Sequence, residues 1–318
     1  MRSLKEITLS HDTTLPQVPT VPRLPADRAA EAQQADPRVT DPAVMRAIAR
    51  DLRRQVIHMV APTGQGYVQQ GLGAADLFAT IYFAELRMRS AQPDWPERDR
   101  FLLSTAHNTA IFYATLAARG LIDPASLATY CHDGSPLEIN ASERVGPMVE
   151  ATCGSLGQGL SVGVGMALAA RRHRRDSRVV VMLGDGELQE GQVWEAAMAA
   201  GSFGLGNLLL VIDYNAMQVE GHVDEVMEME PVDAKWRAFN WRVEAVDGHD
   251  IPELLAAYTR AREHADQSTC LIARTLAGKG APSLEGVLGH TMKLPPDMAA
   301  RALAELDADA AVRSTESS

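Results

Sequence analysis

Short apolar runs alternate along the chain with longer segments of helical periodicity. The apolar runs lie at residues 100–104, 178–183, 207–213, 241–246 and 270–275. Runs of this length are typical of strands that are buried on both faces of a sheet. The segments between them predict helices at 42–60, 74–86, 109–120, 190–203 and 251–265, and a glycine-rich turn that leads into a helix at 155–173. This alternation predicts an α/β fold with a mainly parallel sheet flanked by helices.

The two ends of the chain differ from its middle. Residues 1–40 are rich in Pro, Thr, Asp, Gln and Ala without a sustained period, and they predict an extended or partly disordered arm. Residues 41–296 carry the alternating pattern and predict one domain. We expect residues 297–318 to form a tail that frays over 306–318. Within the domain, the glycine- and glutamine-rich stretch 63–73 predicts a loop.

Composition and charge indicate which partners and which cellular compartment to expect. The 318 residues carry a formal net charge of −11, which disfavours nucleic acid as a general partner. The basic run 171–175 ends a predicted helix, so a solvated helix C-terminus explains it better than a binding patch. The N-terminus lacks the apolar core of a signal peptide, and no apolar stretch is long enough to span a membrane. The three cysteines, Cys131, Cys153 and Cys270, are odd in number and far apart, and together these features predict a cytoplasmic protein.

Polar residues follow two successive apolar runs where the predicted strands end. Asp185 and Glu187 lie in the sequence Gly-Asp-Gly-Glu after the first run, and Asn215 closes the Asp-Tyr-Asn that follows the second. In parallel sheets, ligands bind beyond the carboxyl ends of the strands. Carboxylate and amide oxygens suit Mg²⁺, and glycines beside them let the backbone approach a phosphate. The pattern indicates a magnesium-bridged diphosphate, although two ordinary strand-to-helix turns capped by Asp and Asn would give the same residues.

The spacing of these clusters is that of the thiamine diphosphate motif, in which Gly-Asp-Gly is followed by Asn after a helix and a strand. The surrounding segments resemble transketolases over roughly residues 45–295. The segments are "RDRFLLSTAHNTAIFYATLAARG", "TCGSLGQGLSVGVGMALAA", "GDGELQEGQVWEAAMAAGSFGLGNLLLVIDYNAMQVEG", "WRVEAVDGHD" and "TLAGKG". The chain is most similar to the shorter, N-terminal subunit of transketolases that are split into two chains. The resemblance implies that residues 41–296 form the domain that binds the diphosphate of the cofactor.

The resemblance implies a role for each matching residue in the strand-end clusters. Asp185 and Asn215 would bind magnesium, with the backbone carbonyl of Met217 as a third protein ligand. Gly186 would contact the diphosphate, and Glu187 and Asn215 would also bind the cofactor.

Other matching residues lie outside these clusters. His107 would reach the diphosphate or the substrate region and is a candidate catalytic residue, and Gly154 and Leu156 would line the ring system of the cofactor. Glu190 and Glu195 match acids that link the cofactor sites across the subunit interface, although a solvated helix face would explain both equally well.

The resemblance also implies that one essential group is absent from this chain. In transketolases, the glutamate that activates the cofactor lies in a second, pyrimidine-binding domain, and another subunit's copy of that domain completes each site. No second α/β block follows residue 280. We therefore expect a separate C-terminal transketolase-like subunit that carries this domain, in an α2β2 assembly.

Two positions in the substrate region depart from the family pattern. An ungapped comparison places Tyr67 where transketolases have the histidine of a Gly-His-Pro, and Asn140 where they have a second such histidine. Both histidines belong to the sugar-phosphate site of the family, so their replacement predicts non-standard substrates. The alternative is that the two replacements are neutral and that another residue compensates for them. His290 occurs near a family His-Gly, but Thr291 replaces the glycine.

These observations leave three alternative functions, of which the first is favoured. The first is a thiamine diphosphate- and magnesium-binding subunit of a transketolase-like enzyme that transfers a two-carbon ketol or related acyl unit. The second is a component of a 2-oxo acid decarboxylase or dehydrogenase, similar to E1, which would use the same cofactor. The third is a regulatory or scaffolding subunit without catalysis, which the intact Gly-Asp-Gly and Asn215 disfavour.

Overall fold

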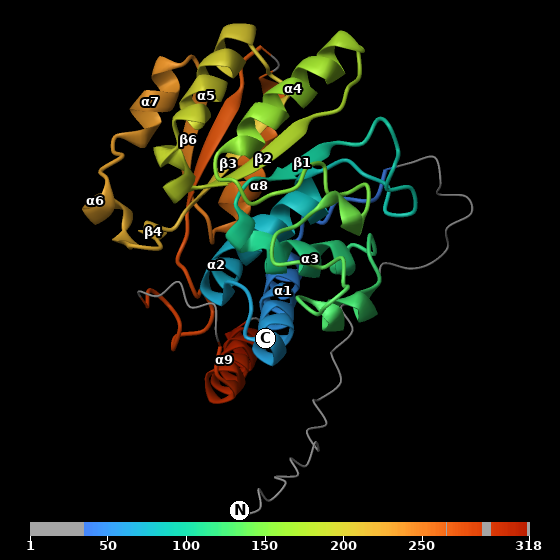
Figure 1. Ribbon diagram of the computed structural model, residues 1–318, viewed down its shortest axis with the longest axis vertical. Helices are drawn as coiled ribbons and strands as arrows, with labels where there is room; N and C mark the ends of the chain where they lie inside the picture. The colour runs from blue at the N-terminus through green and yellow to red at the C-terminus, as the bar shows by residue number, and fades with distance from the viewer. Residues whose placement is uncertain (1–34, 265, 288–293, 317–318) are drawn as a thin grey trace, which may run out of the picture.

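A five-stranded parallel sheet forms the centre of the computed structural model, which describes residues 35–264, 266–287 and 294–316 (Figure 1). The strand order is β1-β2-β3-β7-β6. The strands are β1 (Arg100–Leu103), β2 (Val179–Gly184), β3 (Leu208–Tyr214), β6 (Arg242–Asp247) and β7 (Thr269–Arg274). All five correspond to predicted apolar runs, and the expectation of a mainly parallel sheet flanked by helices is confirmed.

Helices cover both faces of the sheet, because alternate residues of the buried strands point to opposite sides. On one face, residues such as Val180 and Val211 pack with α1 (Pro42–Thr63), α2 (Val68–Thr80), α3 (Thr109–Ala118) and α8 (Ile251–Glu263). On the other face, residues such as Val181 and Leu210 pack with α4 (Gln158–Arg172), α5 (Gly191–Phe203) and α7 (Val232–Ala238). The two layers appear on opposite sides of the sheet in Figure 1.

Shorter elements connect these layers. They are a π-helix (Ile81–Glu85), four 3₁₀ turns (Ala106–Asn108, Pro124–Thr129, Glu143–Val145 and Asp185–Gln189), a small hairpin of β4 (Met217–Gln218) and β5 (Gly221–His222), and α6 (Val223–Val226). Within the described residues, no helix has the length and apolar character needed to cross a membrane.

The expected loop at 63–73 is wrong over its second half, because α2 already begins at Val68. Gly71 and Gly73 lie inside this helix and are required by close packing. A Cβ added at Gly73 would lie 2.9 Å from the carbonyl oxygen of Leu276, and one at Gly71 would lie 3.1 Å from Val56. The glycines that resemble a loop in the sequence therefore allow a buried helix to approach its neighbours.

The C-terminal segment also differs from the expected tail, since it forms α9 (Pro296–Glu316). Ala299, Ala302 and Leu306 are buried, and α9 contacts α1. These three apolar residues recur at a spacing of three and four, which places them on one face of a helix.

At the other end, the last residues of the expected N-terminal arm lie against the domain. Asp36 accepts hydrogen bonds from Ser90 and Arg119, and the backbone N–H of Val39 donates to Phe83. The rest of the expected arm, residues 1–34, lies outside the described residues.

Candidate functional site

The ends of β2 and β3 lie side by side, with Gly184 paired to Asp213 in the parallel register. Asp185 follows directly after β2 and is 2% exposed. Its carboxylate accepts hydrogen bonds from the backbone N–H of Gly186 at 2.9 Å and from that of Ala216 at 2.5 Å. It forms no ion pair with any residue that the structure describes. Burial, and then the nearby charge of Asp213, raise the pKa of Asp185 to about 7.

A tight turn after β3 holds Asn215 and Met217 against this carboxylate. The side-chain oxygen of Asn215 accepts a hydrogen bond from the backbone N–H of Met217 at 3.0 Å. Ala216, between them, has a left-handed φ of +61°, and its N–H is the one that Asp185 binds. The structure therefore brings together Asp185, Asn215 and Met217, the three residues that we expected to ligate magnesium.

The residues at this edge fit a hard divalent cation. A buried carboxylate without a paired cation is costly, and a bound metal ion would remove that cost. In the described part of the chain, no group of three or more His, Cys, Asp or Glu residues could hold a metal. An ion here would then take one carboxylate, an amide oxygen and a backbone carbonyl from the protein, and phosphate or water for the rest, as Mg²⁺ prefers.

Gln218 supplies a second observation that points to a ligand. Its side-chain Nε2 is buried and has no hydrogen-bond partner within the described residues. A Cβ added at Gly186 would lie 3.5 Å from the Cβ of Gln218. Buried amide donors are almost always hydrogen-bonded, so this one marks a place where an acceptor is expected. Sequence reasoning missed Gln218, because a glutamine in a polar loop carries no signal of burial.

Glu187 binds three segments of the protein around the end of β2. Its carboxylate accepts hydrogen bonds from the Ser104 hydroxyl at 2.6 Å and from the backbone N–H groups of Gly157 and Gly184, both at 2.8 Å. The side chain is 1% exposed, and burial raises its pKa. These hydrogen bonds join the three segments around the end of β2, and the expected contact of Glu187 with the cofactor stays a prediction. Ser104 and Gly157 were not singled out in the sequence, because they are far from Glu187 along the chain.

His107 lies on the 3₁₀ turn after β1, beside the end of β2. A Cβ added at Gly184 would lie 3.3 Å from the His107 ring. The ring centroid of Tyr67 is 6.0 Å from that of His107, with the two planes at 69°. The structure therefore places Tyr67 next to His107 and close to the Asp185 loop.

Asn140 and Gly154 form a second contact in the expected substrate region. Gly154 has a φ of +141°, which side chains rarely adopt, and a Cβ there would lie 3.2 Å from Nδ2 of Asn140. Leu156 follows and is 38% exposed, and its carbonyl accepts a hydrogen bond from Gln192.

No contact with Asp185 is recorded for the remaining expected site residues that the structure describes, Glu190 and Glu195. Glu190 and Glu195 are exposed at the start of α5. His290 lies outside the described residues.

A second buried acid supports the end of β3. Asp213 is fully buried, accepts a hydrogen bond from Asn108 at 3.1 Å and another from Thr275, and has a raised pKa because of burial. It follows an apolar run, so the sequence shows it as part of a strand-end cluster, but its distant partners could not be predicted from spacing.

Comparison with known proteins identifies the family. Residues 44–301 match the family described as "Transketolase, thiamine diphosphate binding domain". The chain belongs to this family. The expected resemblance to transketolases is confirmed, and the family match supports binding of thiamine diphosphate.

Two relatives and one solved structure show where the similarity lies. The chain is 38% identical to the "6-deoxy-6-sulfo-D-fructose transketolase subunit SqwG" of Clostridium sp. (strain MSTE9), covering 83% of this chain and 96% of that protein. It is 35% identical to one of the subunits of the apulose-4-phosphate transketolase of Phocaeicola vulgatus, covering 74% and 83%. The solved transketolase from Campylobacter jejuni superimposes with a TM-score of 0.78 at 28% identity, over 84% of this chain and 43% of that one. The transketolase-like chain therefore matches separate subunits along most of their length, but spans less than half of the solved transketolase chain.

Proposed function

We propose that this transketolase-family chain binds thiamine diphosphate and Mg²⁺ at the carboxyl ends of β2 and β3, as one subunit of a two-chain enzyme that transfers a two-carbon ketol or related acyl unit. The observation that carries the proposal is Asp185, a buried carboxylate without an ion-pair partner in the described residues, held 2.5 Å from the turn that presents Asn215 and Met217. Asp185 lies within the residues that match the thiamine diphosphate-binding domain of transketolases, which supports the assignment.

Different residues of this chain would bind the metal ion, contact the diphosphate and hold the surrounding backbone in place. Asp185, Asn215 and the carbonyl of Met217 would ligate magnesium, and Gly186 would let the diphosphate approach the backbone. Glu187 would keep Gly157 and Gly184 in place through its two 2.8 Å hydrogen bonds. When bound, thiamine diphosphate supplies the nucleophilic carbon that attacks the carbonyl of the donor.

Residues farther from the metal would face the reacting part of the site. His107 would bind the diphosphate or the substrate, Gly154 and Leu156 would line the cofactor rings, and Tyr67 and Asn140 would shape the substrate pocket. The contacts of Tyr67 with His107 and of Asn140 with Gly154 support this arrangement.

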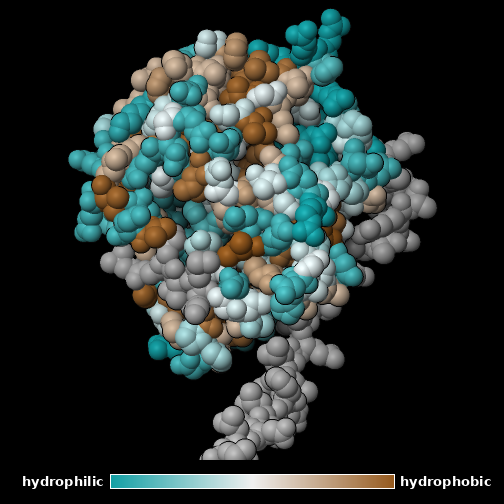
Figure 2. All heavy atoms as spheres, in the orientation of Figure 1, coloured by the Kyte–Doolittle hydropathy of each residue, from teal (hydrophilic) through white to brown (hydrophobic). Residues whose placement is uncertain are grey.

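A partner chain with the pyrimidine-binding domain would complete the enzyme, in an α2β2 assembly. The names of two relatives as transketolase subunits support a partner. Met198 and Phe203 on α5 are 54% and 49% exposed. Figure 2 shows hydrophobic side chains among the hydrophilic ones on the face where α4 and α5 lie. We place the partner against this exposed face of α5. Glu190 and Glu195 at the start of α5 would then couple the sites across the interface between the two chains.

The substrates would differ from the usual ketose and aldose phosphates. Tyr67 and Asn140 replace two family histidines, and the two relatives are named for a sulfonated sugar and for apulose 4-phosphate. The location would be the cytoplasm, which the three unpaired cysteines support.

Calorimetric titration of the full chain with thiamine diphosphate, with and without Mg²⁺, tests the cofactor proposal. We expect Asp185→Ala and Asn215→Ala to abolish the magnesium-dependent part of the affinity, and Glu228→Ala, which removes an exposed acid, to leave it unchanged. Wild-type affinity in both site variants would refute the metal assignment.

The partner proposal needs its own experiment. The tagged chain, incubated with Mg²⁺ and thiamine diphosphate, would be used to capture proteins from its source cells. Recovery of a stoichiometric chain with a pyrimidine-binding domain would support the two-chain enzyme, and recovery of this chain alone would contradict it.

A further inference from the structure

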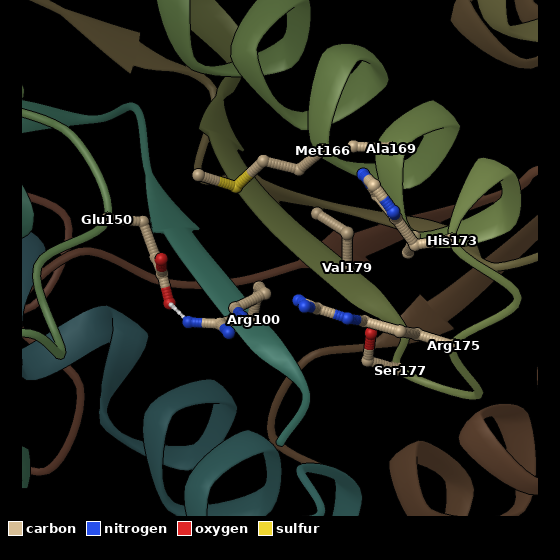
Figure 3. A pocket seen from close by; sticks show the side chains of 9 residues that line it. Arg100, Glu150, Met166, Ala169, His173, Arg175, Ser177 and Val179 are labelled. Atoms are coloured by element: carbon tan, nitrogen blue, oxygen red, sulfur yellow. Dashed lines mark hydrogen bonds and ion pairs between the residues drawn. The ribbon is translucent and has the colours of Figure 1, made fainter. Parts of the chain in front are cut away.

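A cavity of about 270 Å³ lies between the C-terminal half of α4 and the amino ends of β1 and β2 (Figure 3). Met166 and Ala169 of α4 and Val179 of β2 form its apolar part. From Val179 to Gly184, β2 rises by about 17 Å, and Asp185 follows at the far end. The cavity is therefore separate from the site proposed for the cofactor.

The charged residues that line this cavity are mainly basic. Glu150 is the one acid among the described residues that line it, and its carboxylate forms an ion pair with the buried Arg98 as well as with Arg100 at 3.4 Å. Since Arg98 already neutralises the negative charge of Glu150, the positive charge of Arg100 is not neutralised. Arg175 lies 3.8 Å from Glu97, and both side chains are more than 40% exposed, so solvent screens that pair. An anion would be attracted to this space.

The basic run 171–175 has a defined structure at this point. Arg171 donates to the carbonyls of Phe203 and Gly204, as expected for a residue at a solvated helix end. Arg174 then adopts a left-handed φ of +55°, and the N–H of Arg175 donates back to Ala170. This turn carries Arg175 to the wall of the cavity. The interpretation as a solvated helix terminus fits Arg171, and Arg175 in addition lines the cavity.

Ser177 places a hydroxyl group at the same cavity. The residue is 4% exposed and lines the cavity. In Figure 3 the Arg175 side chain extends toward Arg100 beside Ser177, while the guanidinium group of Arg100 is turned to Glu150. Guanidinium groups bind phosphate through charge-assisted hydrogen bonds, and a nearby hydroxyl donor suits the same anion.

We propose that this cavity binds a phosphate monoester with a short apolar body. Two cationic side chains match the two negative charges of such a phosphate, and the Ser177 hydroxyl donates a further hydrogen bond. The apolar body packs against Met166, Ala169 and Val179. A volume of about 270 Å³ corresponds to roughly nine water molecules, which allows a ligand of about ten non-hydrogen atoms.

Methyl NMR of the full chain labelled at its methionines tests this proposal with phenyl phosphate as the probe. Met166 reports on the cavity and Met217 on the cofactor site. We expect phenyl phosphate to shift the Met166 methyl signal in a saturable way and to leave Met217 unchanged. Inorganic phosphate, which lacks the apolar body, is expected to bind about tenfold more weakly.

Two variants and a matched control separate a specific site from general attraction. Arg175→Gln is expected to weaken binding about tenfold, and Ala169→Leu to block the cavity while keeping every charge. Arg172→Gln removes the same charge from an exposed residue that does not line the cavity, and it should have no effect. The proposal is wrong if Met166 does not shift at about 10 mM probe, if only Met217 shifts, or if Arg172→Gln and Arg175→Gln weaken binding equally.

Discussion

The carboxylate of Asp185 and the backbone N–H of Ala216 are joined by a 2.5 Å hydrogen bond that connects the ends of two neighbouring strands. This bond holds the Asn215 turn against an acid that lies buried without an ion-pair partner among the described residues. A metal ion bound here, as we propose, would meet oxygen atoms that are already ordered, which lowers the cost of ordering them on binding.

The pH dependence of cofactor binding follows from Asp185. Burial and the charge of Asp213 raise its pKa to about 7, and a metal ion binds only the ionised carboxylate. We expect magnesium-dependent affinity for thiamine diphosphate to fall up to about tenfold per pH unit below about pH 7 and to level off above it. Calorimetric titrations across this range measure the effect. A flat profile for the wild-type chain would contradict the assignment.

The same pKa predicts the opposite trend for folding without ligands. The folded-state pKa of Asp185 lies above the ordinary value of 3.8, so the folded chain binds this proton more tightly than the unfolded chain does. Its contribution to the free energy of unfolding therefore declines as the pH rises from about 4 to about 7. Asp185→Asn should remove this contribution, which urea unfolding at several pH values would detect as a smaller difference between mildly acidic and neutral pH.

Gln218 gives a prediction that separates binding from stability. If its buried Nε2 donates to the bound cofactor or to a metal-bound water, Gln218→Leu should weaken thiamine diphosphate binding about tenfold. The same variant should fold at least as stably, because it removes a buried donor that has no partner among the described residues. Calorimetry and thermal unfolding of the two chains check both parts. Weaker binding accompanied by a large loss of stability would indicate a structural role instead.

The strand ends could be predicted because their signal is local. Each apolar run and the polar cluster after it are contiguous in the sequence, and parallel pairing then places Asp185 and Asn215 together. The partners of Glu187 could not be predicted, since Ser104 and Gly157 reach it only through the folded chain. Gly71 shows the opposite difficulty: a glycine that permits close helix packing has the same sequence signal as one in a loop.

Gly154 is expected to tolerate no side chain. Its φ of +141° disfavours any residue with a Cβ, and that Cβ would lie 3.2 Å from Asn140. Gly154→Ala should therefore lower the free energy of unfolding by roughly 1–3 kcal/mol. Gly191→Ala is the matched control, because a Cβ there meets nothing within 4 Å and the residue begins α5. Denaturant unfolding of both variants tests the prediction, and equal stabilities would show that the Gly154 backbone relaxes freely.

Tyr67 and Asn140 are expected to set the choice of substrate in the complete two-chain enzyme. Tyr67 lies beside the His107 ring, and Asn140 lies beside Gly154; the proposal assigns His107 and Gly154 to the site of the cofactor and substrate. The double variant Tyr67→His and Asn140→His would restore the imidazoles that transketolases use for sugar phosphates. We expect its kcat/KM for ketose phosphates to rise about tenfold or more, corresponding to one recovered hydrogen bond to a charged or polar group. Unchanged thiamine diphosphate affinity in the same variant is the control, because it would localise the effect to the substrate. An unaltered substrate preference together with intact cofactor binding would show that these two positions do not determine specificity.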